Sequence, residues 1–215
     1  MSFVITQVSQ ASPERCAIDT SRGVAVAGHS FGAYTTLALC GARPILRHLL
    51  PPVDGEYADD LADPRVCVGI AMSPQGPGCS RFDEGSYATI DRPVMCFSGT
   101  CDVQLSADGT LQEPKVRKEA FRCMPPSTDE AKKKYFLWLE NADHMAFCTV
   151  NSFWLTPSEA RDDTMGIVYA MMIAFCDTHL KSDPAERSSG QALLTERYAR
   201  LFCGKVVTQL EFSEK

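Results

Sequence analysis

"VAVAGHSFGAYTTLAL", residues 24–39, is the stretch that decides the fold. It begins with a short apolar run typical of a buried strand and ends with a helical pattern. Between them lies a G-x-S-x-G motif with Ser30 at its centre. This order predicts a nucleophile elbow, in which the serine hydroxyl stands clear of the backbone at the top of a parallel sheet. We expect glycine to be needed at Gly28 and Gly32, because a side chain there would collide with the neighbouring strand and helix.

The length and composition of the chain predict one globular domain over residues 1–215. The chain is 45% hydrophobic and 22% charged, which suits a domain with a substantial core. Its net charge of −6 argues against nucleic acid and anionic membrane as partners. The longest apolar stretch, 166–176, is too short to span a bilayer, so we expect no membrane span.

The cysteines and the first residues bear on metal binding and location. None of the ten cysteines forms a C-x-x-C pair or stands at zinc spacing from a histidine, so no metal site is predicted. Several lie in apolar strand or helix patterns, which favours buried free thiols over isolated disulfides. The first residues lack the basic segment of a signal peptide. These features together predict a cytoplasmic protein.

Apolar runs and helical patterns alternate along the rest of the chain. They predict strands over 23–28, 65–72, 93–99 and 135–140, and helices over 3–10, 31–42, 115–124 and 157–179. Strands separated by helices predict an α/β fold with a mostly parallel, doubly wound sheet and flanking helices. The tail, 193–215, holds a short helical pattern and an alternating segment over 206–212 that the sequence does not place.

Three residues near predicted strand ends suggest nucleophilic catalysis. A serine hydroxyl is a poor nucleophile unless a base lies within hydrogen-bond reach and an acid orients that base. In this fold the chain order is serine, acid, histidine, each after a strand. The third predicted strand runs into Asp102 and the fourth into His144. We therefore predict Ser30 as nucleophile, Asp102 as acid and His144 as base.

The other histidines are weaker candidates for the base. His29 lies inside the elbow and is expected to point away from the serine, and His48 lies in a loop-like stretch. His179 ends the last predicted helix, where a cation at the helix C-terminus is the simpler role.

Two other aspartates compete for the acid. Asp108 lies farther from the strand end than Asp102, and Asp143 adjoins the histidine and could not easily reach its far nitrogen. An ordinary turn residue is the alternative role for Asp102.

At this point the chain resembles a known family. Four blocks are similar, in order and spacing, to those of α/β-hydrolases of the dienelactone hydrolase-like type; they read VAVAGHSFGAYTTLAL, AMSPQGPG, PVMCFSGTCD and LENADHMAF. This branch also resembles platelet-activating-factor acetylhydrolases and chlorophyllases. The resemblance covers residues 23–180 and implies a serine esterase that cleaves small carboxylic esters, often with short acyl groups, without a cofactor. It implies the roles given above to Ser30, Asp102 and His144, and the backbone N–H of Phe31 as one oxyanion donor.

The start of the chain departs from the family. The family has further strands before its elbow, and a loop there supplies the second oxyanion N–H, whereas 29 residues precede Ser30 here. Two other functions therefore stay open: a weakly active or non-catalytic binding module, and a thioesterase or peptidase. The departure also predicts a shortened sheet with the strand 24–27 as an unprotected edge. We expect a homo-oligomer in which a second copy covers this edge together with the segment 3–10.

Several side chains flank the predicted site and are candidates for a substrate pocket. They are Gln75, Pro77, Met145, Phe147, Phe153 and Trp154. Packing under the last helix is at least as good an explanation for each of them.

Overall fold

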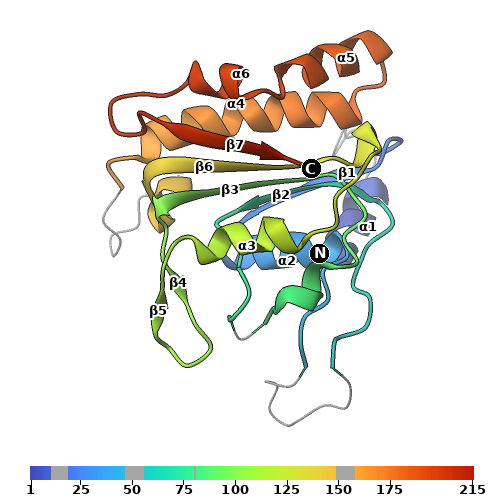
Figure 1. Ribbon diagram of the computed structural model, residues 1–215. Helices are drawn as coiled ribbons and strands as arrows, with labels where there is room; N and C mark the ends of the chain where they lie inside the picture. Colours follow the sequence, from blue (N-terminus) through green and yellow to red (C-terminus); the bar gives the residue numbers. More distant parts are fainter. Residues whose placement is uncertain (11–18, 47–55, 80, 149–157) are drawn as a thin grey trace.

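The protein has an α/β fold with a mostly parallel central sheet, as predicted (Figure 1). A computed structural model describes residues 1–10, 19–46, 56–79, 81–148 and 158–215. The five-stranded sheet has the order β1-β2-β3-β6-β7. Its strands are β1 (Val24–His29), β2 (Val66–Met72), β3 (Val94–Cys101), β6 (Lys134–Asp143) and β7 (Leu210–Glu214). The first four run parallel, and β7 pairs antiparallel with β6.

Helices cover both faces of the sheet. The face below the sheet in Figure 1 carries α2 (Phe31–Leu39) and α3 (Val116–Cys123). The opposite face carries α4 (Arg161–Leu180), with α5 (Pro184–Leu193) and α6 (Glu196–Arg200) against it. Short 3₁₀ helices occupy the connections: η1 (Glu84–Tyr87), η2 (Glu130–Lys132) and η3 (His144–Phe147). No helix in the described parts of the chain is long and apolar enough to cross a membrane.

The core lies in two layers, one on each face of the sheet. In β6 the side chains alternate: Phe136 and Trp138 face α2 and α3, whereas Tyr135, Leu137 and Leu139 face α4. All five are buried. Strands covered on both faces are continuously apolar, which is why short apolar runs predicted them.

Five elements, β4 (Gln104–Leu105), β5 (Leu111–Gln112), α5, α6 and β7, were not predicted as such. A two-stranded hairpin, formed by β4 and β5, projects from the end of β3, at the lower left of Figure 1. Helix α5 follows α4 directly. The tail that the sequence did not place forms α6 and then β7, the sheet edge opposite β1.

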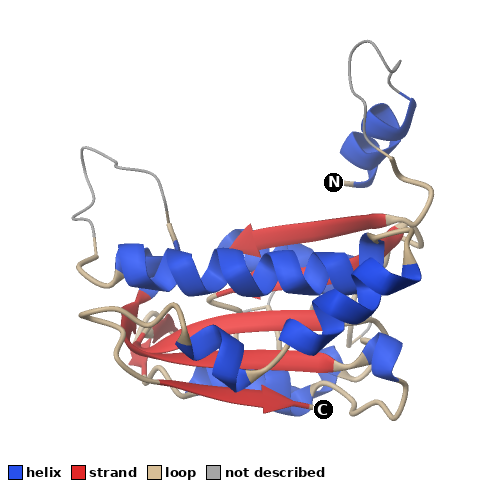
Figure 2. Cartoon of the chain, turned by 90° about the horizontal axis from the view of Figure 1, so that it is seen from above, coloured by secondary structure: helices blue, strands red, loops and turns tan. Residues whose placement is uncertain are grey.

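The strand that carries the elbow, β1, is the other edge, as expected. Helix α1 (Ser2–Gln10) stands at this side of the sheet, away from the main body in Figure 2. It buries Ile5 and is tied down by Arg65, which donates to Thr6 Oγ1 at 2.7 Å and to the Ser2 carbonyl at 2.9 Å. A groove of about 440 Å³ separates α1 from β1 and has mainly apolar walls, including Val4 and Val8.

Candidate active site

The turn between β1 and α2 holds Ser30 in a strained backbone conformation. Its φ is 56° and its ψ is −116°, a region that residues other than glycine rarely adopt. The Ser30 N–H donates to the Met72 carbonyl at 3.0 Å, which fixes the turn to the end of β2. A Cβ at Gly28 would lie 2.2 Å from the Gly32 carbonyl oxygen, so the turn requires glycine there. The expectation for Gly32 was wrong, because a Cβ at that position would point into open space.

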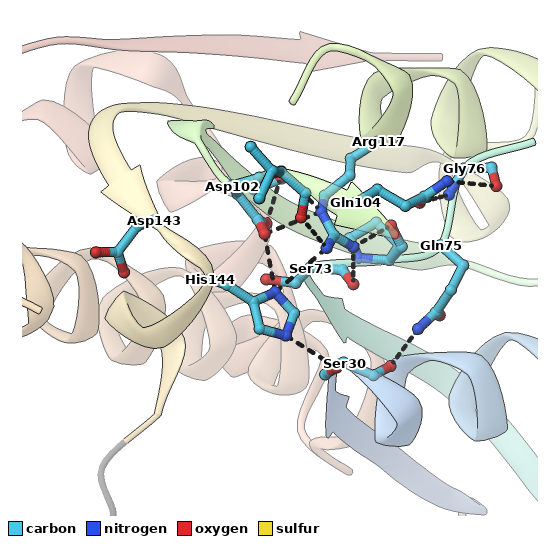
Figure 3. A network of polar contacts seen from close by, with 12 residues as sticks. Ser30, Ser73, Gln75, Gly76, Asp102, Gln104, Arg117, Asp143 and His144 are labelled. Carbon is cyan, nitrogen blue, oxygen red and sulfur yellow. Dashed lines mark hydrogen bonds and ion pairs between the residues drawn. The ribbon is translucent and has the colours of Figure 1, made fainter. Parts of the chain in front are cut away.

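Ser30, His144 and Asp102 form a chain of hydrogen bonds (Figure 3). His144 Nε2 lies 2.9 Å from Ser30 Oγ, and His144 Nδ1 lies 2.9 Å from Asp102 Oδ1. The three residues follow β1, β3 and β6, whose parallel pairing brings their carboxyl ends to one edge of the sheet. A proton on Nδ1, donated to the carboxylate, leaves Nε2 free to accept the serine proton.

The competing aspartates have other partners. Asp143 points away from the imidazole in Figure 3, and its Oδ1 accepts two backbone N–H groups at the start of η3, each at 2.9 Å. Asp108 lies in the turn of the β4–β5 hairpin and accepts from the Thr110 backbone N–H at 3.0 Å. Of the three aspartates, Asp102 is the one that contacts His144.

The carboxylate of Asp102 is fully buried and bound on both oxygens. Ser98 Oγ donates to Oδ2 at 2.8 Å, and Arg117 Nε lies 2.9 Å from Oδ1. Burial alone would raise the pKa of Asp102. The hydrogen bond from His144 and the charge of Arg117 outweigh burial, so the pKa lies below its usual value. The Asp102 carboxyl group is therefore ionised at neutral pH.

Arg117 is a member of this cluster that the sequence did not predict. It comes from α3 and its side chain is 5% exposed. Besides Asp102, the guanidinium contacts carbonyls at the ends of β2 and β3, and its NH2 lies 3.3 Å from His144 Nδ1. No sequence signal separates it from Lys118 and Arg122 on the same helix, because its role depends on how α3 docks.

His29 also lies against His144. Its Nε2 lies 2.9 Å from the His144 carbonyl oxygen, and the two ring centroids are 4.7 Å apart. Burial lowers the pKa of His29, so the ring is neutral at pH 7. A residue expected only to point away from the serine thus packs on the imidazole.

The remaining histidines lie outside the cluster. His179 packs edge-on against Phe175, and burial lowers its pKa to about 4. The expected cation at the helix end is therefore a neutral ring at pH 7, which corrects the prediction. His48 lies outside the described residues.

A cleft of about 320 Å³ opens beside Ser30 and His144. Its other walls come from Gln75, Val103, Gln104, Leu105, Leu111 and Arg117. The β4–β5 hairpin supplies Leu105 and Leu111, whose exposed fractions of 62% and 71% are high for leucine. No sequence pattern identified these two leucines.

Of the predicted pocket residues, Gln75 lines this cleft, where its Nε2 donates to the Ser30 carbonyl at 2.9 Å. Pro77 and Met145 are not among the lining residues. Phe147 is 3% exposed and belongs to the core layer under α4. Phe153 and Trp154 lie outside the described residues.

The predicted oxyanion donor is the backbone N–H of Phe31, the first residue of α2. The first N–H groups of a helix have no carbonyl partner within it, so they can bind an anion. The C=O and N–H of a trans peptide point in opposite directions. Gln75, bound to the carbonyl of the Ser30–Phe31 peptide, therefore lies on the side away from this N–H.

Comparison with known proteins adds no assignment. No family model matches the chain, and no curated protein matches it.

Proposed function

We propose that the protein is a serine hydrolase that cleaves small carboxylic esters through an acyl-enzyme. The observation that carries this proposal is the unbroken contact from Ser30 Oγ through His144 to Asp102, at 2.9 Å for each step. The strained conformation of Ser30 at a strand-to-helix turn supports it, because this geometry presents a nucleophile at the top of a sheet.

The proposed reaction has two halves. Ser30 Oγ attacks the ester carbonyl carbon while His144 Nε2 takes the hydroxyl proton, and the Phe31 N–H stabilises the oxyanion that forms. The C–O bond to the alcohol then breaks, and the alcohol leaves with the proton from His144. A water molecule attacks the acyl carbon with His144 again as base, which releases the acid and restores Ser30.

The cleft supports small substrates. Its volume of about 320 Å³ is near the lower limit of ligand pockets. The exposed leucines of the hairpin offer an apolar wall. Arg117 also lines the cleft, but its guanidinium is already paired with the Asp102 carboxylate and with backbone carbonyls, so it does not pair with an acidic acyl chain. We propose short, uncharged acyl groups.

The test combines labelling and kinetics. A fluorophosphonate should modify Ser30, identified by peptide mass spectrometry, and should abolish hydrolysis of p-nitrophenyl acetate. Ser30→Ala should lower kcat by orders of magnitude, on the order of a millionfold if the three residues act as a unit. Full activity in Ser30→Ala would end the proposal. Labelling without turnover would favour a binding module, and faster cleavage of matched thioesters or amides would favour a thioesterase or peptidase.

We also propose that the protein self-associates and is cytoplasmic. The free edge of β1 and the apolar groove beside it support association with a second copy. The burial of Cys40 and Cys96 as small apolar side chains supports a reducing compartment.

A further inference from the structure

Arg117 is a buried cation placed between the proposed acid and the proposed base. Its Nε lies 2.9 Å from both the carbonyl oxygen and Oδ1 of Asp102. Its NH2 lies 3.3 Å from His144 Nδ1, which is itself 2.9 Å from the same Oδ1. One carboxylate oxygen therefore receives both the guanidinium and the imidazole (Figure 3).

Four of the five N–H groups of the Arg117 guanidinium are bound within the protein, and the fifth faces His144. The guanidinium carries no acceptor. Nε donates to Asp102. NH1 donates to the Ser73 and Pro74 carbonyls at 2.9 and 3.1 Å. NH2 donates to the Val103 carbonyl at 2.7 Å and faces His144. Although Arg117 borders the cleft, these contacts bind its guanidinium to the protein rather than to a substrate.

The contacts join three strand ends. Ser73 and Pro74 follow β2, Asp102 and Val103 follow β3, and His144 follows β6. The planar guanidinium of Arg117 is bound to backbone carbonyls and has little freedom to rotate. It therefore restrains Asp102 Oδ1, the oxygen that it shares with the imidazole. Ser98 holds the other oxygen of Asp102 at 2.8 Å, and together the two contacts fix the plane of the carboxylate.

We infer that Arg117 is a positioning residue of the proposed hydrolase, which holds the Asp102 carboxylate in the orientation that directs His144 Nε2 at Ser30. This inference rests on the proposed function. It assigns Arg117 no contact with substrate, so its removal should affect kcat rather than KM.

The central variant is Arg117→Met, which keeps much of the side-chain volume and removes the fork. A displaced catalytic group costs up to about 100-fold in rate, so we expect kcat to fall about 10- to 100-fold while KM changes less than about threefold. In an Asp102→Asn background the same substitution should cost less than about threefold, because the carboxylate that it orients is gone. Arg117→Lys keeps a cation without the fork and should recover only part of kcat.

Arg92→Met is the matched control. Arg92 also donates to several backbone carbonyls, those of Leu39, Asp63 and Val66, but it has no contact with the cluster. It should lower the melting temperature and leave kcat within about twofold. An equal loss of kcat in Arg92→Met and Arg117→Met, an equal cost in both Asp102 backgrounds, or a loss carried by KM would overturn the inference.

A readout without turnover separates this inference from the proposed function. The His144 Nδ1 proton, hydrogen-bonded to Asp102, should give a downfield ¹H NMR resonance that disappears in His144→Ala. We expect Arg117→Met, or Arg117→Lys if the first variant does not fold, to shift or broaden this resonance, whereas Arg92→Met leaves it unchanged. An unchanged resonance would refute the positioning role even if the protein hydrolyses no ester. A shifted resonance in an inactive protein would sustain the role and refute the proposed function.

Discussion

At the scale of single residues, the elbow shows which parts of a motif the local geometry requires. Gly28 and Gly32 are equal in the G-x-S-x-G pattern, yet a Cβ would overlap backbone only at Gly28. We expect Gly28→Ala to destabilise the fold by about 2 kcal/mol or more, because the Gly32 carbonyl cannot move without disrupting the first turn of α2.

Gly32→Ala is the matched variant and should change the free energy of unfolding by less than about 0.5 kcal/mol. Urea denaturation of both variants measures the difference. Equal losses in the free energy of unfolding of the two variants would show that a side chain at Gly32 also collides with its neighbours.

The partly buried His179 leads to a prediction about pH. Its pKa is lowered to about 4 in the folded protein from an ordinary value of 6.5. Between these two values the unfolded chain binds a proton that the folded chain does not, so stability falls as pH falls from 6.5 towards 4. The loss amounts to up to about 3 kcal/mol.

His179→Leu removes this titration. Its melting temperature should fall less than that of the wild type between pH 7 and pH 5, measured by thermal unfolding. Parallel curves for the two proteins would contradict the assignment of a neutral, partly buried ring.

How far the site could be predicted also depends on individual residues. Ser30, Asp102 and His144 could be proposed because each follows an apolar run, and parallel strands end at one edge of the sheet. The contacts of His29 and Arg117 depend on how side chains pack after the chain has folded. Neither residue stands in a position that sequence spacing alone identifies.

At the scale of elements, the strands that could be predicted are those with a clear apolar pattern in the sequence. The strands β2, β3 and β6 are continuous apolar runs because helices cover both their faces, whereas β1 is an apolar run although it is only partly buried. The strands β4 and β5 have two residues each, too few for any periodicity. Strand β7 is a half-covered edge that shares only residues 210–212 with the alternating segment 206–212, and the sequence does not indicate that it pairs with β6.

The β4–β5 hairpin should influence which acyl chains the cleft accepts. Leu105 and Leu111 form its apolar wall beside Ser30. Leu105→Ala and Leu111→Ala shorten the side chains of that wall and enlarge the cleft. The ratio of kcat/KM for p-nitrophenyl hexanoate to that for the acetate should therefore rise by about three- to tenfold. Thermal unfolding should be unchanged, because both side chains are largely exposed. An unchanged ratio of kcat/KM for the two esters would show that the hairpin does not contact the acyl chain.

At the scale of the whole molecule, the two edges of the sheet differ. On the β1 side, α1 leaves Phe3 and Val4 exposed at 73% and 49%, beside an apolar groove along a strand without lysine or proline. Such an edge favours association. We expect sedimentation velocity at micromolar concentration to show a dimer.

Substitutions at the two sides distinguish the surfaces. Phe3→Asp should give a monomer, since it places a charge on the surface beside β1. Leu201→Asp changes an equally exposed residue, at 72%, next to α6 on the β7 side, and should leave the dimer intact. A wild-type monomer under these conditions would show that α1 covers the edge sufficiently by itself.

The pre-steady-state release of p-nitrophenol from p-nitrophenyl acetate measures whether Ser30 forms an acyl-enzyme. We predict a burst close to one equivalent of p-nitrophenol per protein chain, followed by slower steady turnover, because acylation releases the alcohol before water frees the serine. Ser30→Ala should show no burst, and intact-protein mass spectrometry of the quenched wild type should show an acetyl group on Ser30. A burst that persists in Ser30→Ala, or an acetyl group on another residue, would contradict the account.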